Sequence, residues 1–282
     1  MKIGMNRLSL FIVLFTISIL SITGMYAYAL FDVTSVGEIE NDSDKLLDGV
    51  LGTAIYTVGD STYVIAASEN EHGIEIIDIS DPTSPTSVGR LADDGTKLLN
   101  KSVDVATFIL PNYLNAHTGL HEDIAFAAVA GSGDNGIEMV NISDPTNLSD
   151  TYRQGDGVDT GVCTAANGER CLGHVSAVAI ATIDGKTYVV AAGQADDGIE
   201  IIEVTTDEDN ENIFQSTVVG RIVDDGTTLL NFPNDVAIAT IDGKTYAVVA
   251  AAIDDGIEII DISDPTSPVP VSYTHLTLPT KA

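Results

Sequence analysis

Acidic side chains are the residues of this 282-residue chain whose type and spacing could do chemistry. Single and paired aspartates recur just before glycine, at intervals that repeat along the chain. Carboxylate oxygens are hard ligands that suit Ca²⁺, and clustered acids gain from neutralisation by a cation. The candidate metal ligands are Asp93, Asp94, Asp134, Asp196, Asp197, Asp224, Asp225, Asp254 and Asp255. They make Ca²⁺ the candidate cofactor.

Two other interpretations of these acids stay open. No segment fits the calcium-loop pattern D-x-[DN]-x-[DN]-G, and the acidic stretch 207–212 lacks the glycine of that loop. Asp-Asp-Gly is also typical of turns, in which an aspartate bonds the backbone. A solvated acidic surface that keeps the chain soluble is the third interpretation. Turn formation is the favoured one.

No catalytic constellation is present in the sequence. The G-x-G-x-x-G match at 131–136 precedes a strand-like run instead of a helix, so it does not predict a nucleotide site. His117 and His121 have i,i+4 spacing but flank Gly119, which favours a polar loop. Neither G-x-S-x-G nor H-E-x-x-H occurs. Cys163 and Cys171 lie close together and are expected to form a disulfide outside the cytoplasm.

Charge and composition exclude several partners. There are 42 acidic and 12 basic residues, a formal net charge of −30, which argues against nucleic acid and anionic lipid surfaces. The 44% of apolar residues is enough for a folded core. With no Trp and 6% aromatic residues, a carbohydrate-binding face is disfavoured, because sugars generally stack on exposed rings.

Both ends of the chain are expected to lie outside the fold. Residues 1–29 have the basic start, apolar stretch and Ala27-Tyr28-Ala29 site of a secretory signal, or alternatively of an uncleaved anchor, the one predicted membrane contact. The chain is thus expected outside the cytoplasm: extracellular, at the cell surface or in the periplasm. Residues 271–282 contain no acid and match the in-frame translation of a transposase-type sequencing adapter. We therefore expect the natural protein to continue beyond residue 270.

A repeat of about sixty residues organises the region 30–270. The phrase GIEIIDISDPTSP starts at Gly73 and again at Gly256, with variants at Gly136 and Gly198. Each unit holds four strand-like runs, A to D, such as run A at 236–241, run B at 245–251 and run C at 257–262 in the last copy. The units lie near 34–85, 86–148, 149–212 and 213–268.

The runs predict four-stranded antiparallel sheets. Asp184-Gly185 and Asp242-Gly243 separate runs A and B, and such pairs form type I′ hairpin turns. Run C is nearly apolar on both faces, so its sheet should be covered on both sides. Serial units of this kind describe an all-β protein, a β-propeller of about four visible blades that is an incomplete part of a larger ring. The D-like run 34–39 could pair with the last blade and close a four-bladed ring.

The segment IEIIDISDPTSP, at 74–85 and 257–268, resembles the core of LVIVD-type repeats. The resemblance covers four units across roughly 35–268, and the third departs from it at 205–208. It implies propeller blades in a secreted or cell-surface protein and implies no single activity.

Strand alternation places the acids on one face. The B–C and D–A loops must share one end of an up-and-down propeller, and these loops carry the aspartates named above. We expect a non-enzymatic extracytoplasmic scaffold that presents this face to cations or a basic protein partner. The alternatives are a hydrolase or lyase with its site in the loop insertions or in a C-terminal part beyond this sequence, and a carbohydrate-binding propeller.

Overall fold

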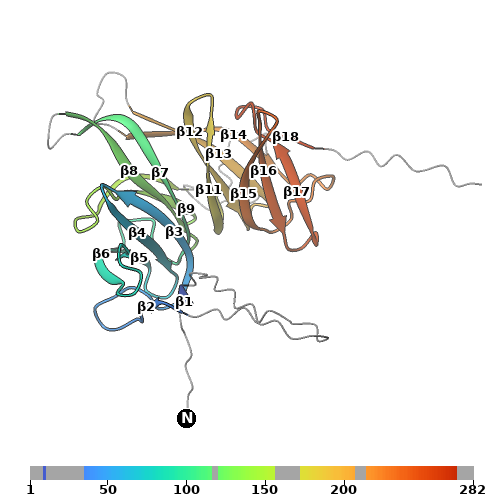
Figure 1. The fold of residues 1–282 in the computed structure, drawn as a ribbon. Helices are drawn as coiled ribbons and strands as arrows, with labels where there is room; N and C mark the ends of the chain where they lie inside the picture. The colour runs from blue at the N-terminus through green and yellow to red at the C-terminus, as the bar shows by residue number, and fades with distance from the viewer. Residues whose placement is uncertain (1–8, 11–34, 116–119, 156–171, 207–213, 272–282) are drawn as a thin grey trace, which may run out of the picture.

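The computed structural model describes residues 9–10, 35–115, 120–155, 172–206 and 214–271 (Figure 1). Regular structure in this part of the chain is entirely β-strand, and none of its segments is a helix long and apolar enough to cross a membrane. Four antiparallel sheets of four strands follow one another along the chain, with strands in sequence order. These sheets are the blades of a β-propeller, as the repeat predicts.

Each blade runs from an A strand to a D strand. Blade 1 contains β3 (Val50–Val58), β4 (Ser61–Ser68), β5 (Gly73–Asp78) and β6 (Thr86–Ala92). Blade 2 contains β7 (Ser102–Asn115), β8 (Leu120–Gly131), β9 (Gly136–Asn141) and β10 (Ser149–Gly155). Blade 3 contains β11 (Val175–Ile183), β12 (Lys186–Gly193), β13 (Gly198–Thr206) and β14 (Phe214–Val223). Blade 4 contains β15 (Pro233–Ile241), β16 (Lys244–Ala251), β17 (Gly256–Asp261) and β18 (Val269–Pro270). Two further strands, β1 (Ser9–Leu10) and β2 (Gly37–Glu38), pair with each other.

The Asp-Gly hairpins form as predicted. Both residues of Asp184-Gly185 have positive φ, 50° and 78°, and Asp242-Gly243 has 51° and 79°. The register closes each turn directly, since Ile183 pairs with Lys186 and Ile241 with Lys244. Two positive φ values in succession define the type I′ turn, whose twist matches that of antiparallel strands.

The sequence repeat and the sheets are out of phase by one strand. The unit 86–148 supplies the outer strand β6 of blade 1 and the strands β7 to β9 of blade 2. Each unit therefore straddles two blades, so the chain within each unit links one sheet to the next.

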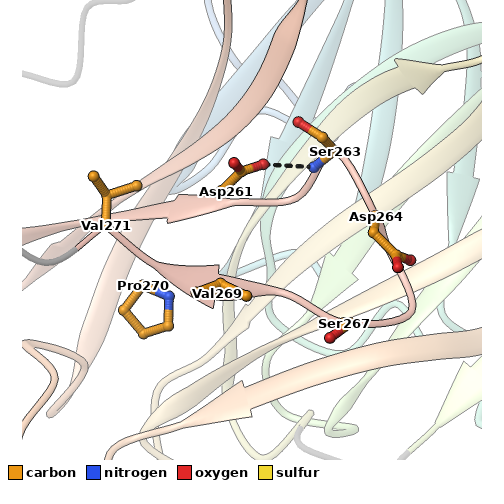
Figure 2. Close-up of a pocket in the computed structure, with 7 residues that line it drawn as sticks. All are labelled: Asp261, Ser263, Asp264, Ser267, Val269, Pro270 and Val271. Atoms are coloured by element: carbon orange, nitrogen blue, oxygen red, sulfur yellow. Dashed lines mark hydrogen bonds between the residues drawn. The ribbon is translucent and has the colours of Figure 1, made fainter.

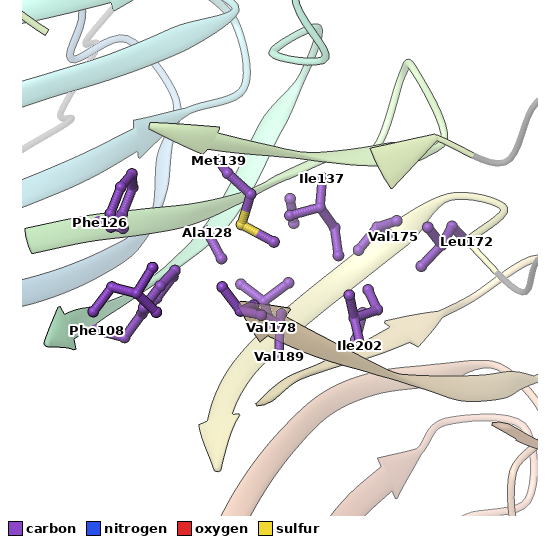
Figure 3. Packing of buried hydrophobic residues seen from close by; sticks show 14 of the residues in the cluster. Phe108, Phe126, Ala128, Ile137, Met139, Leu172, Val175, Val178, Val189 and Ile202 are labelled. Atoms are coloured by element: carbon purple, nitrogen blue, oxygen red, sulfur yellow. The ribbon is translucent and has the colours of Figure 1, made fainter. Parts of the chain in front are cut away.

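Apolar clusters lie between neighbouring blades. Figure 3 shows the one between blades 2 and 3, where Phe126 and Met139 of blade 2 face Val178 and Val189 of blade 3. Equivalent clusters join blades 1 and 2 and blades 3 and 4. The C strands of blades 1 to 3 are covered on both faces, as their composition predicts. In blade 1, Ile76 packs toward blade 2, and Ile77 packs on the other side of β5.

The four blades form an open series. The inner strands pack in chain order, β3 on β7, β7 on β11 and β11 on β15, whereas β15 and β3 make no comparable contact. In the described residues β17 pairs with β18, and β2 pairs with β1. The alternative of a four-bladed ring closed by pairing of 34–39 with the last blade is therefore not seen among the described residues.

Candidate functional site

The B–C and D–A loops lie at one end of the blades and hold one another by hydrogen bonds. We call this end the acidic rim; its described parts are residues 39–49, 69–72, 93–101, 132–135, 172–174, 194–197, 224–232 and 252–255. The other end, formed by the A–B and C–D turns, is the opposite rim.

One acid in each B–C loop is bonded to the backbone of the D–A loop beside it. The N–H of Asn100 donates to Oδ2 of Asp134 at 2.9 Å, and the N–H of Asn231 donates to Oδ2 of Asp254 at 2.8 Å. Asp196 accepts the N–H of Gly173 in the same way, at 2.7 Å. In blade 1 Glu71 replaces the aspartate. These acids accept hydrogen bonds from loop N–H groups that have no partner in the strand pairing.

The next residue of each B–C loop reaches the following blade. Oδ1 of Asp197 accepts the N–H of Phe232 at 2.8 Å, from blade 3 to blade 4. His72 and Asn135 make the equivalent bonds with the next blade, at 3.0 and 2.9 Å. All three acceptors have positive φ, and so does Asp255, their counterpart in blade 4, at 51°. The position is therefore a joint between blades.

The D–A aspartates form turns. Oδ1 of Asp94 accepts the N–H and hydroxyl of Thr96 at 3.0 and 2.6 Å, and Asp225 does the same with Thr227 at 2.8 and 2.6 Å. Hydrogen bonding by Lys97, and then by Thr96, lowers the pKa of the Asp94 carboxyl; the Thr227 bonds lower that of Asp225. Asp93 and Asp224 each accept the N–H of the glycine two residues on. Both exposed acids, Asp94 and Asp225, therefore stay ionised in mildly acidic solution.

The structure gives most of the candidate metal ligands a backbone partner. Within the described residues no three histidine, cysteine, aspartate or glutamate side chains converge as a metal site would require. Calcium binding stays a prediction for this rim. Cys163 and Cys171, the predicted disulfide, lie outside the described residues, as does His117.

The opposite rim also carries acids, so acidity is not confined to one end. Asp81, Asp144 and Asp264 cap the C–D turns through the same threonine bonds that Asp94 makes. A hollow of about 430 Å³ lies beside the blade 4 turn. Figure 2 shows the residues that line it: Asp261, Ser263, Asp264, Ser267, Val269, Pro270 and Val271. Lys244 binds Asp261 at 2.8 Å and lowers its pKa to about 2, so its carboxylate is already neutralised by a cation.

Sequence reasoning missed the buried glutamate of the C strand. Glu75 and Glu138 are fully buried and accept the N–H groups of Leu46 and Leu98, at 2.9 and 2.7 Å, from the D–A loop. Glu258 does the same for Leu229. The signal was available, because Gly-Ile-Glu opens all four C runs. These glutamates fasten the D–A loops onto the sheets.

Sequence reasoning also missed two inner-strand acids. Asp104 of β7 and Asp235 of β15 occupy the same position in blades 2 and 4, one residue past the bulge of each A strand. Oδ2 of Asp104 accepts the N–H of Val178 in blade 3 at 2.9 Å. Burial, and then the nearby charge of Asp235, raises the pKa of Asp104 against the effect of this bond. A carboxyl group held toward its protonated form beside a second one is a general-acid arrangement.

Comparison with known proteins agrees with the fold. The model of the LVIVD repeat matches residues 58–93 and 241–274, which hold strands B to D of blades 1 and 4. The chain therefore contains two segments that match the LVIVD repeat, and both belong to β-propeller blades. No curated protein matches it at the level searched.

Two solved structures show the same fold. A putative 6-phosphogluconolactonase from Bacteroides uniformis is 15% identical, with a TM-score of 0.52 over 78% of this chain and 53% of that one. A protein from Lactobacillus plantarum is 15% identical, with a TM-score of 0.53 over 86% of this chain and 58% of that one. This chain thus spans little more than half the length of either protein. At such identity the likeness concerns the fold alone.

Proposed function

We propose that this chain is a non-enzymatic extracytoplasmic scaffold whose acidic rim binds a basic protein partner or cations. The observation that carries the proposal is the pair Asp94 and Asp225, exposed and ionised at the same position of two D–A loops. Asp94 also forms an ion pair with Lys97 at 2.5 Å, so the proposal depends chiefly on Asp225. Their turns fix the position of each carboxylate, so little side-chain entropy is lost on binding. The net charge of −30 adds a long-range attraction for basic partners.

The test uses two variants that remove the same charge from different ends. Asp94→Asn/Asp225→Asn acts on the acidic rim, and Asp81→Asn/Asp264→Asn acts on the opposite rim. All four aspartates make the same bonds to a threonine, and asparagine keeps the Oδ1 acceptor. Binding of poly-L-lysine is measured by titration calorimetry at several salt concentrations.

We expect the acidic-rim variant to bind poly-L-lysine about threefold to tenfold more weakly than the opposite-rim variant. Equal loss in both variants would mean that net charge alone attracts the probe and would overturn the proposal. A calcium titration followed by melting temperature separates the two ligand classes. A calcium-induced rise in melting temperature that the acidic-rim substitutions abolish would support cation binding. If calcium does not change the melting temperature, the ligand of the rim is a basic partner.

A second candidate function rests on Asp104 and Asp235. A hydrolase or lyase site between the inner strands is favoured by the raised pKa of Asp104 and its neighbouring carboxylate. A panel of glycoside, lactone and ester substrates tests it. Activity abolished by Asp104→Asn would support the enzyme, and no turnover of any substrate would leave the scaffold.

A further inference from the structure

Three blades bury the same apolar face against the blade that follows. In blade 1 this face consists of Ile65 and Ala67 on β4 and Ile74 and Ile76 on β5, each with 0% exposure. The corresponding residues of blades 2 and 3 are also fully buried: Ala128, Ala130, Ile137, Met139, Val190, Ala192, Ile199 and Ile201. The face is therefore an interface at every place where a described blade follows.

In blade 4 the same face is open. Ile257 and Ile259, which correspond to Ile74 and Ile76, are 61% and 44% exposed. Ala250 on β16 is exposed as well. Residues 73–85 and 256–268 have identical sequences, so the difference in burial arises because no described blade packs on this face of blade 4, and not from the strand itself. We call Val248, Ala250, Ile257 and Ile259 the open face.

The hydrogen bond that joins each B–C loop to the next blade also has no counterpart at blade 4 among the described residues. Asp255 has the left-handed backbone of His72, Asn135 and Asp197, which each accept an N–H from the next blade. No hydrogen bond to the Asp255 carboxylate is made by the residues that the structure describes. Its geometry matches an acceptor for the first residue of one more inner strand.

The strand β2 lies on the side of blade 1 that faces away from blade 2. Gly37 of β2 lies against the carbonyl of Pro82 in the C–D turn of blade 1. The D-strand glycines Gly89 and Gly220 contact Pro145 and Pro265 of the following blade in the same way, and a Cβ at any of the three would collide with that carbonyl. β2 thus sits where the outer strand of a preceding blade would lie, and β1 occupies the edge that its C strand would pair with.

We propose that the open face is the docking surface for one more blade of this same repeat. The side chains that the following blade contributes to the other three interfaces define what this occupant must supply. It brings a leucine from its D–A loop, like Leu99, Leu172 and Leu230, and a valine from its inner strand, like Val105, Val178 and Val236. It also donates a backbone N–H to Asp255.

The test adds such a blade by fusion. The chain is kept to Pro268 and continued with a second copy of residues 86–148, which restores the junction that follows Pro85. Ile259→Asp is then introduced into the full chain and into the fusion. Ile201→Asp in the full chain calibrates the cost of a charge on a buried face, and the melting temperature of each variant is compared with that of its parent.

We expect Ile259→Asp to lower the melting temperature by less than about 2 °C in the full chain and by about 6 °C or more in the fusion. A copy carrying Ala127→Asp on its receiving face should restore tolerance of Ile259→Asp. Equal small shifts in both chains would show that the blade does not dock and would overturn the proposal. A full chain that sediments as a dimer, and that Ile259→Asp dissociates, would instead assign the face to a second copy.

Discussion

The backbone N–H of Phe232 donates to the carboxylate of Asp197 at 2.8 Å, across the boundary between blades 3 and 4. The two residues lie 35 positions apart, and each has a left-handed backbone, with φ of 62° and 52°. The joint therefore ties the relative placement of two sheets to one aspartate, and the loop acids stabilise the fold besides contributing charge.

Asp197→Ala should lower the free energy of unfolding by about 1 kcal/mol, because it leaves the Phe232 N–H without its acceptor. Asp255→Ala is the matched control: alanine meets the same backbone strain there, at φ of 51°, without losing a described bond. Urea denaturation of both variants gives the difference. Asp197→Asn should retain most of the stability, and an equal cost for the two alanine variants would contradict the role of the joint.

Glu75→Ala should cost about 2–4 kcal/mol, because it removes a fully buried carboxylate that accepts the Leu46 N–H and the Ser87 hydroxyl. Glu258→Ala, at the half-buried equivalent in blade 4, should cost about 1 kcal/mol. Chemical denaturation checks both values. Similar costs would indicate that burial does not decide the strength of this contact.

Asp104→Asn should stabilise the protein at neutral pH. The pKa of Asp104 is raised in the folded state, so its stabilising contribution is complete below the unfolded pKa and is lost as pH rises through the folded value. Asparagine does not ionise, so the variant avoids this loss of stability as pH rises, and its amide oxygen still accepts the Val178 N–H. The melting temperatures of variant and parent should converge in acid and separate above a pH of about 4; a constant difference at all pH values would contradict the prediction.

Ile199→Ala should destabilise the protein by about 2–5 kcal/mol, since it empties a fully buried site between blades 3 and 4. Ile257→Ala, at the equivalent and 61% exposed position, should cost less than about 1 kcal/mol. The same substitution in the same strand context thus measures the packing between blades. Guanidinium denaturation reports both, and equal costs would be inconsistent with an open fourth blade.

Short-range features of this fold were predictable from sequence, and contacts between blades were not. The Asp242-Gly243 turn depends on two adjacent residues, and the sheet order follows from the period of the repeat. The role of Glu75 depends on the backbone N–H of Leu46, 29 residues away, which no local pattern reveals. Asp104 and Asp235 lie on strands of different blades, so their interaction needs the packing of the inner strands.

The B–C and D–A loops share one end of the blades, and Asp94 and Asp225 form turns there, the interpretation of these acids that the sequence favours. The sequence indicates which loops share an end of the blades, because strand direction alternates. The sequence does not show that one carboxylate oxygen of Asp134, and one of Asp254, accepts a hydrogen bond from a backbone N–H of the neighbouring loop. The opposite rim carries acids as well, such as Asp81, so the negative charge is not confined to the B–C and D–A loops.

The one-strand offset between repeat and sheet bears on how such a protein can change length. A tandem duplication of one unit, inserted at any Ser-Asp-Pro turn, provides the outer strand of one blade and the inner three strands of the next. The inserted unit is joined to its neighbours on either side as the original units are joined to each other. Every sheet therefore keeps all of its strands. Unequal recombination between units that share an identical segment, such as 73–85 and 256–268, can therefore alter the number of blades in a single event and leave each sheet with its four strands.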